Sequence, residues 1–171
     1  MKSLNEFVSI NEVSTNDNII NAMKNALKEE LLAWYGYIMI RDWLIGENRE
    51  NIAKFYEDTA KDELEDHAYW LMQRISQLGG YIDDITVSPS SIIDAIHKYI
   101  APVWKGDKID IVQSLETNIK NEESAIETYK ELIAMTEQVD PSSNSKLKEI
   151  LADEETHLQE LKDYLDDINL K

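Results

Sequence analysis

Residues 112–133 read VQSLETNIKNEESAIETYKELI, and apolar side chains recur along this stretch at alternating steps of three and four residues. Such steps place side chains on one face of an α-helix. The stripe consists of Val112, Leu115, Ile119, Glu122, Ile126, Tyr129 and Ile133. Its only charged member is Glu122. The stretch therefore predicts a long amphipathic helix whose buried face carries one carboxylate.

A stripe with the same period lies nearer the C-terminus and carries both an acid and a histidine. It consists of Leu147, Ile150, Glu154, His157, Leu161, Tyr164 and Ile168. Across the chain, four acids and two histidines lie on such stripes: Glu30, Glu63, His67, Glu122, Glu154 and His157. Burying an unpaired carboxylate costs several kcal/mol, comparable with the net stability of a domain. We therefore expect divalent metal ions to compensate these charges.

The composition fits one compact helical domain. The chain has 171 residues but only 5 Gly and 3 Pro. It has no apolar run of the roughly 20 residues that span a bilayer and no signal-peptide stretch, so we expect a cytoplasmic protein without membrane contact. Because the chain has no Cys, only oxygen and nitrogen ligands are available to a metal. The net charge of -17 argues against a nucleic-acid partner and favours cations.

Helix caps and helix breakers divide the chain into an arm and a bundle. We expect an irregular N-terminal arm over residues 1–15 and a helical domain over residues 16–171. Within the domain, helices are expected over 16–45, 49–78, 91–100, 107–139 and 144–168. The helix over 91–100 is short, and Asp107 is expected to cap the one that follows. Two helical hairpins joined by a long crossover form an all-α four-helix bundle.

The two halves of the chain repeat the same motifs. Glu30-x-x-Ala-x-x-x-Tyr37 in the first half returns as Glu122-x-x-Ala-x-x-x-Tyr129 in the second. An Asp-Glu pair also precedes a histidine in both halves, at residues 62–67 and 153–157. The number of residues from Glu30 to Glu63 is nearly the same as the number from Glu122 to Glu154. The repeat therefore predicts a site with approximate twofold symmetry.

Each of these residues also has an ordinary structural interpretation. Acids make up about a fifth of the chain, so Glu154-x-x-His157 alone is a weak signal. A Glu and a His three or four residues apart on an exposed helix usually make only a solvated contact. His97 lies outside the pattern, and we interpret it as a packing or surface residue. Four aromatic residues are interpreted as core side chains, with redox relays as the alternative: Trp34, Tyr37, Trp70 and Tyr129.

These motifs resemble those of the ferritin-like di-iron carboxylate proteins over nearly all of residues 16–168. Residues 30–37, ELLAWYGY, resemble the first-helix ligand motif of bacterioferritins, and residues 67–78 resemble their second helix. The short crossover helix, and an expected lack of room for a fifth helix after Lys171, resemble the Dps-like ferritins. All six ligands fit within one bundle, as in bacterioferritins. The chain is thus identified as a Dps-like ferritin with a bacterioferritin-type dimetal site inside the subunit.

The resemblance implies a role for each candidate ligand. The terminal acids would be Glu30 and Glu122, the bridging acids Glu63 and Glu154, and the nitrogen ligands His67 and His157. The family motif is Glu-x-x-His, but position 64, three before His67, is Leu. Because residues i and i+4 share a helix face, Glu63 is assigned instead. The implied cofactor is two iron ions per subunit, with manganese as the alternative. No haem is expected, since no Met adjoins the second-helix acid.

The function implied by the resemblance is iron storage and detoxification. Two Fe(II) ions would be oxidised by hydrogen peroxide or O2, and the product would be mineralised inside a shell, with twelve subunits favoured over twenty-four. Such chemistry protects against oxidative damage. The excess of acidic residues predicts, in contrast, that the protein does not bind DNA directly. The alternatives are a manganese catalase, a rubrerythrin-like peroxidase, or a structural bundle with a vestigial site.

Overall fold

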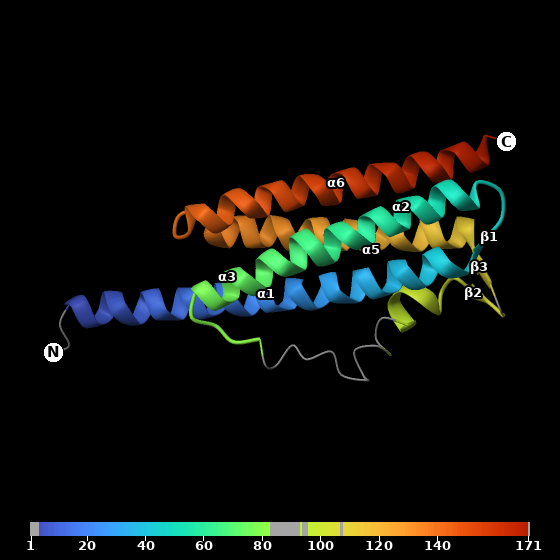
Figure 1. Cartoon of the computed structure of the whole chain (residues 1–171). Coiled ribbons are helices and arrows are strands. Elements are labelled where there is room, and N and C mark those ends of the chain that lie inside the picture. The colour runs from blue at the N-terminus through green and yellow to red at the C-terminus, as the bar shows by residue number, and fades with distance from the viewer. Residues whose placement is uncertain (1–3, 83–92, 94–95, 107, 171) are drawn as a thin grey trace.

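The computed structural model describes residues 4–82, 93, 96–106 and 108–170. Its long helical runs are α1 (Leu4–Trp43), then α2 (Arg49–Lys61), η1 (Asp62–Ala68) and α3 (Tyr69–Gln77) as one continuous run, then α5 (Ile111–Thr136) and α6 (Pro141–Asn169). They pack side by side as a four-helix bundle (Figure 1). α1 turns back into α2, and α5 turns back into α6. The predicted pair of antiparallel hairpins is confirmed.

The N-terminal segment differs from the expected irregular arm, because α1 already begins at Leu4 and runs for 40 residues. Residues 4–15 contain neither Gly nor Pro, and the Ser, Thr and Asn at 14–16 cost only a few tenths of a kcal/mol each inside a helix. The blue end of α1 projects beyond the other helices in Figure 1. Neither α1 nor any other helix among the described residues is long and apolar enough to cross a membrane.

The second helical run contains a π-helical segment in its middle. Residues Asp62–Ala68 form η1, flanked by α-helical geometry on both sides. A π segment accommodates one extra residue within a helix without ending it, and such segments often coincide with functional sites. The expected single helix over residues 49–78 is therefore present, with a local change of winding.

Aspartates cap both helices of the second hairpin. The carboxylate of Asp110 accepts a hydrogen bond from the Gln113 backbone N–H at 3.0 Å, so α5 begins at Ile111. The cap expected at Asp107 lies outside the described residues. Asp140 accepts from the Ser143 backbone N–H at 3.1 Å, and a proline occupies the first turn of α6. Proline suits this position because its missing N–H has no partner within the helix.

The crossover between the hairpins is only partly described. Of the short helix expected over residues 91–100, the structure shows the turn η2 (Ile96–Ile100) and a helical residue at 93. A small sheet that the sequence did not predict lies at one end of the bundle. It consists of β1 (Leu44–Ile45), β3 (Lys108–Asp110) and β2 (Trp104–Lys105), in that order. Strands of two or three residues are too short to show a period in the sequence.

The core is divided into two apolar clusters with a polar layer between them. One cluster, near the turn from α1 to α2, includes Ile40 and Tyr56. The other, towards the opposite end, includes Met23, Leu71 and Leu147. The polar layer between them is the candidate site.

The aromatic residues singled out in the sequence pack as core side chains. Tyr37 and Tyr129 are each 1% exposed. Trp34 and Trp70 are partly buried and pack against the two clusters. His97 is exposed on η2.

Candidate metal centre

The polar layer consists of the six residues predicted as ligands, and each of them is at most 6% exposed. Every long helical run contributes: Glu30 from α1, Glu63 and His67 from η1, Glu122 from α5, and Glu154 and His157 from α6. The structure therefore brings the whole predicted set together at one level of the bundle.

Their ligand atoms form two overlapping groups, in each of which all atoms lie within 4.8 Å of one another. Glu63 and Glu154 belong to both groups. The groups are completed by Glu30 and His67 on one side, and by Glu122 and His157 on the other. Each group thus has two shared acids, one acid of its own and one imidazole. This composition suits two neighbouring metal ions with carboxylates between them.

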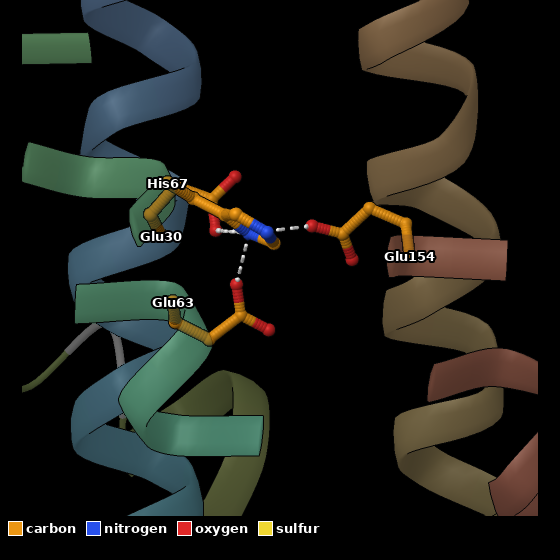
Figure 2. Close-up of side chains that lie close together, drawn as sticks. All are labelled: Glu30, Glu63, His67 and Glu154. Atoms are coloured by element: carbon orange, nitrogen blue, oxygen red, sulfur yellow. Dashed lines mark hydrogen bonds and ion pairs between the residues drawn. The ribbon is translucent and has the colours of Figure 1, made fainter. Parts of the chain in front are cut away.

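Figure 2 shows the first group around His67, whose ring points between three carboxylates. Its Nδ1 lies 3.0 Å from Glu63 Oε2, 3.2 Å from Glu154 Oε1 and 3.6 Å from Glu30 Oε2. In the second group, His157 Nδ1 lies 3.7 Å from Glu63 Oε1 and 3.9 Å from Glu154 Oε2. Both imidazoles therefore turn the same nitrogen towards the shared acids.

The winding of η1 places Glu63 rather than its neighbours in the site. Glu63 and His67 are both buried and hydrogen-bonded across four residues, whereas Leu64 is partly exposed and Glu65 is exposed. The sequence has one more residue between acid and histidine than the Glu-x-x-His of α6. The π-helical turn absorbs this residue and returns both side chains to the core.

Two aspartates face the far side of the imidazoles, each from the opposite helical run. Asp62 Oδ2 lies 3.4 Å from His157 Nε2, and Asp153 Oδ2 lies 3.5 Å from His67 Nε2. Carboxylates that contact the second nitrogen of a metal-binding histidine fix its ring orientation and tautomer. These partners were not predicted, although the repeated Asp-Glu pair was the signal that could have identified them.

Two tyrosines contact Glu30 and Glu122, and each tyrosine reaches the acid on the other helix. Tyr37 of α1 donates a hydrogen bond to Glu122 Oε1 on α5, and Tyr129 of α5 donates one to Glu30 Oε1 on α1. Burial raises the pKa of both phenols, and the adjacent carboxylates raise it further. Both tyrosines are therefore neutral donors. The core interpretation of these residues was correct but missed the hydrogen bonds.

Comparison with known proteins agrees with this geometry. A profile of the ferritin-like domain matches residues 20–171. The chain belongs to the ferritin-like family. The predicted fold and family are thereby confirmed. Comparison with curated proteins gives no match.

Several solved structures resemble this ferritin-like protein. The dodecameric thioferritin of Bacteroides fragilis, a bacterioferritin-related protein, is 30% identical with a TM-score of 0.77, covering 90% of this chain and 88% of that one. Dps from Thermosynechococcus elongatus is 15% identical, with a TM-score of 0.74 and coverage of 90% and 94%. Rhodobacter capsulatus bacterioferritin is 21% identical, with a TM-score of 0.68 and coverage of 90% and 86%. At these lower identities, the last two show a common fold alone.

The charged groups in the site of this ferritin-like protein shift one another's pKa values. Burial raises the pKa of Glu63 and Glu122 well above the ordinary value, and the nearby Glu154 raises both further. Burial also opposes ionisation of Glu154, yet contacts with His157 and His67 hold its pKa below the ordinary value. Despite burial, contacts with acids raise the pKa of His157 to about 10. Protons thus compensate part of the negative charge in the metal-free protein.

The donor set fits a pair of divalent cations. Two buried atoms that face the cluster, Glu154 Oε1 and His157 Nδ1, make no hydrogen bond among the described residues. Four ionised carboxylates carry four negative charges, which two divalent cations would balance. Carboxylate oxygen and imidazole nitrogen together suit iron or manganese. Leaving such groups buried without cations would cost several kcal/mol.

Proposed function

We propose that this ferritin-like protein oxidises Fe(II) at the six-residue site and stores the product inside a shell of its own subunits. The observation that carries the proposal is the sharing of Glu63 and Glu154 by two complete ligand groups. Similarity to proteins described as Dps and bacterioferritin supports it. The shared acids would hold two Fe(II) substrate ions close enough to react with one oxidant.

The electrons, protons and charges of the proposed reaction balance. Two Fe(II) ions supply two electrons, which with two protons reduce one hydrogen peroxide to two water molecules. Because both electrons are used together, no hydroxyl radical needs to form. The cationic charge then rises from four to six, while four carboxylates remain. Hydroxide and oxide formed from water by loss of protons would balance this excess as Fe(III) passes into a mineral. O2 is the alternative oxidant.

The surrounding residues prepare the ligands for this cycle. Tyr37 and Tyr129 fix one oxygen of each terminal acid and leave the other free to bind. Asp62 favours the tautomer of His157 that carries its proton on Nε2, so Nδ1 can donate its lone pair. Asp153 lies beside His67 Nε2 without a hydrogen bond, and its charge can orient that ring. The protein thus holds its ligands in position before the substrate ions arrive, which lowers the cost of binding them.

We propose a shell of twelve subunits. The relative from Bacteroides fragilis is described as dodecameric, and at 30% identity it covers 90% of this chain. Mass photometry of the purified protein tests this assembly. A single species at twelve times the chain mass of 19.8 kDa is expected, whereas a monomer or dimer would reject the shell.

The activity is tested by adding two equivalents of Fe(II) per chain and then hydrogen peroxide, while Fe(III) absorbance and peroxide consumption are followed. We expect two Fe(II) oxidised per peroxide. Glu154→Ala removes a shared acid and should abolish the rapid phase, whereas Glu155→Ala, at an exposed neighbouring position, should retain it. Oxygen evolution without net iron oxidation would instead indicate a catalase. Absence of metal binding would indicate a structural bundle.

A further inference from the structure

The candidate site is approached by two cavities that lie between different pairs of helices. One lies between α1 and α5 and is lined at its inner end by Glu30 and Glu122. The other lies between α2 and α6 and is lined by Asp62 and His157 at the edge of the site. Both cavities are lined by acids, but four of the five acids in the α1–α5 cavity belong to the six-residue site. Outside that site, the charged residues of the α1–α5 cavity are Glu29 and Lys98 alone.

The α2–α6 cavity is acidic. Its walls carry four acids and one lysine: Asp58, Asp62, Asp153, Glu160 and Lys54. Lys54 is paired with Asp58, so the net charge of the wall remains negative. Acid-lined clefts concentrate cations and raise their association rates by about 10- to 1,000-fold.

The α1–α5 cavity is covered by the crossover turn η2. A Cβ atom added at Gly36 of α1 would lie 2.5 Å from Tyr99 Cγ, so glycine is what allows η2 to lie directly on α1. Tyr99 is 3% exposed and meets the Tyr37 ring edge-on at a centroid distance of 5.6 Å. The turn therefore fixes the next side chain, Lys98, at the rim of this cavity.

Lys98 is the only basic residue that lines the α1–α5 cavity in the described part of the chain. Its Nζ donates to Glu29 Oε2 at the rim and lies 5.2 Å from the centre of the Tyr99 ring. Its side chain is about one-third exposed, so the ion pair with Glu29 is accessible to solvent. Outside the site residues, Lys98 therefore balances the charge of Glu29 at this opening, whereas the walls of the α2–α6 cavity keep a net negative charge.

We propose that Lys98 excludes divalent cations from the α1–α5 opening, so that they reach the site through the acidic α2–α6 cavity. This inference rests on the proposed function, since it assigns the route of the Fe(II) substrate. Lys98 thereby determines which opening a cation uses and does not take part in the chemistry. Uncharged molecules such as hydrogen peroxide would not be repelled at this rim.

The test follows Co(II) binding to the metal-free assembled protein by stopped-flow visible absorbance. Lys98→Met keeps the length of the side chain but removes its charge, and should accelerate binding roughly tenfold. Lys98→Arg should retain the wild-type rate. Lys130→Met is the matched control, because it makes the same charge change on α5 outside both cavities. At 1 M salt, where the Debye length falls to about 3 Å, the Lys98→Met acceleration should disappear.

The acidic route is tested in the same assay with Glu160→Gln, which should slow Co(II) binding several-fold. Glu155→Gln, at an exposed position on the same helix outside the cavity, should not. Equal rates for Lys98→Met and Lys130→Met, or an unchanged rate for Glu160→Gln, would overturn the inference. Equilibrium titration separates this result from failure of the proposed function. Variants that still bind two Co(II) per chain leave the site intact, whereas wild-type protein that binds none contradicts both proposals.

Discussion

Replacement of Glu122 by Gln should stabilise the metal-free protein while impairing metal binding. Glutamine keeps the shape of the side chain and an acceptor for the Tyr37 hydroxyl, but removes a charge from a buried cluster of acids. At 4.8 Å, the limit that encloses each ligand group, two unit charges repel by roughly 3.5 kcal/mol at an effective dielectric constant of 20. Protonation limits this strain, so we expect a gain of about 1–3 kcal/mol.

The stability gain of Glu122→Gln should depend on pH, and the sign follows from the raised pKa of Glu122. Burial raises this pKa first, and Glu154 raises it further. Between its ordinary and its raised pKa, this carboxyl is protonated in the folded protein and ionised in the unfolded one. The folded state therefore binds more protons, and wild-type stability falls as the pH rises through this window. The advantage of Glu122→Gln should vanish at pH 4 and grow towards neutrality.

Thermal unfolding in EDTA measures the effect. At about 2–4 °C per kcal/mol for a chain of this size, Tm should rise by about 2–12 °C at pH 7. Added Co(II) should raise the Tm of the wild type more than that of the variant. Glu123→Gln is the matched control, because Glu123 is half-exposed and pairs with Lys162 at the surface. A metal-free Glu122→Gln protein less stable than this control would refute the argument that repulsion and desolvation strain the site.

Three further substitutions, the first with a matched control, test individual features. Glu63→Ala should abolish Co(II) binding in an equilibrium titration, while Glu65→Ala should retain both ions; the reverse would contradict the register of η1. Asp153→Asn should weaken Co(II) affinity by about 10- to 100-fold, and unchanged affinity would dismiss its role in orienting the histidine. Asp140→Ala removes the α6 cap and the ion pair with Arg74 at 2.7 Å, and should lower the unfolding free energy by about 1–3 kcal/mol; a loss below 0.5 kcal/mol in urea unfolding would contradict this.

The sequence was sufficient to predict the bundle and to predict which polar side chains would meet in its core, because both depend on helical period. Polar residues at core positions of four helices are brought together wherever those helices pack, so the positions of Glu122 and Glu154 followed from their stripes. The Glu63 assignment also followed, since residues four apart share a helix face. The π-helical winding around Glu63 could not be predicted, because residues 63 and 67 would share a face in an α-helix as well.

Other features depend on contacts between helices or on weak local signals. The hydrogen bond from Tyr129 to Glu30 joins residues far apart in the chain, so no local pattern specifies it. The repeated Asp-Glu pair marks Asp153, but it does not specify which histidine Asp153 approaches. The sheet strands have too few residues to show a period. The start of α1 was misplaced because residues 14–16 suit a helix cap but also tolerate a helix interior.

The central claim is that this ferritin-like bundle binds two metal ions through two shared acids. Anaerobic titration of the metal-free protein with Fe(II), with bound iron counted per chain, tests it most directly. We expect two Fe(II) per chain for the wild type and, for Glu154→Ala, loss of tight binding at both positions. Binding of no Fe(II) by the wild type, or of two by Glu154→Ala, would contradict the account.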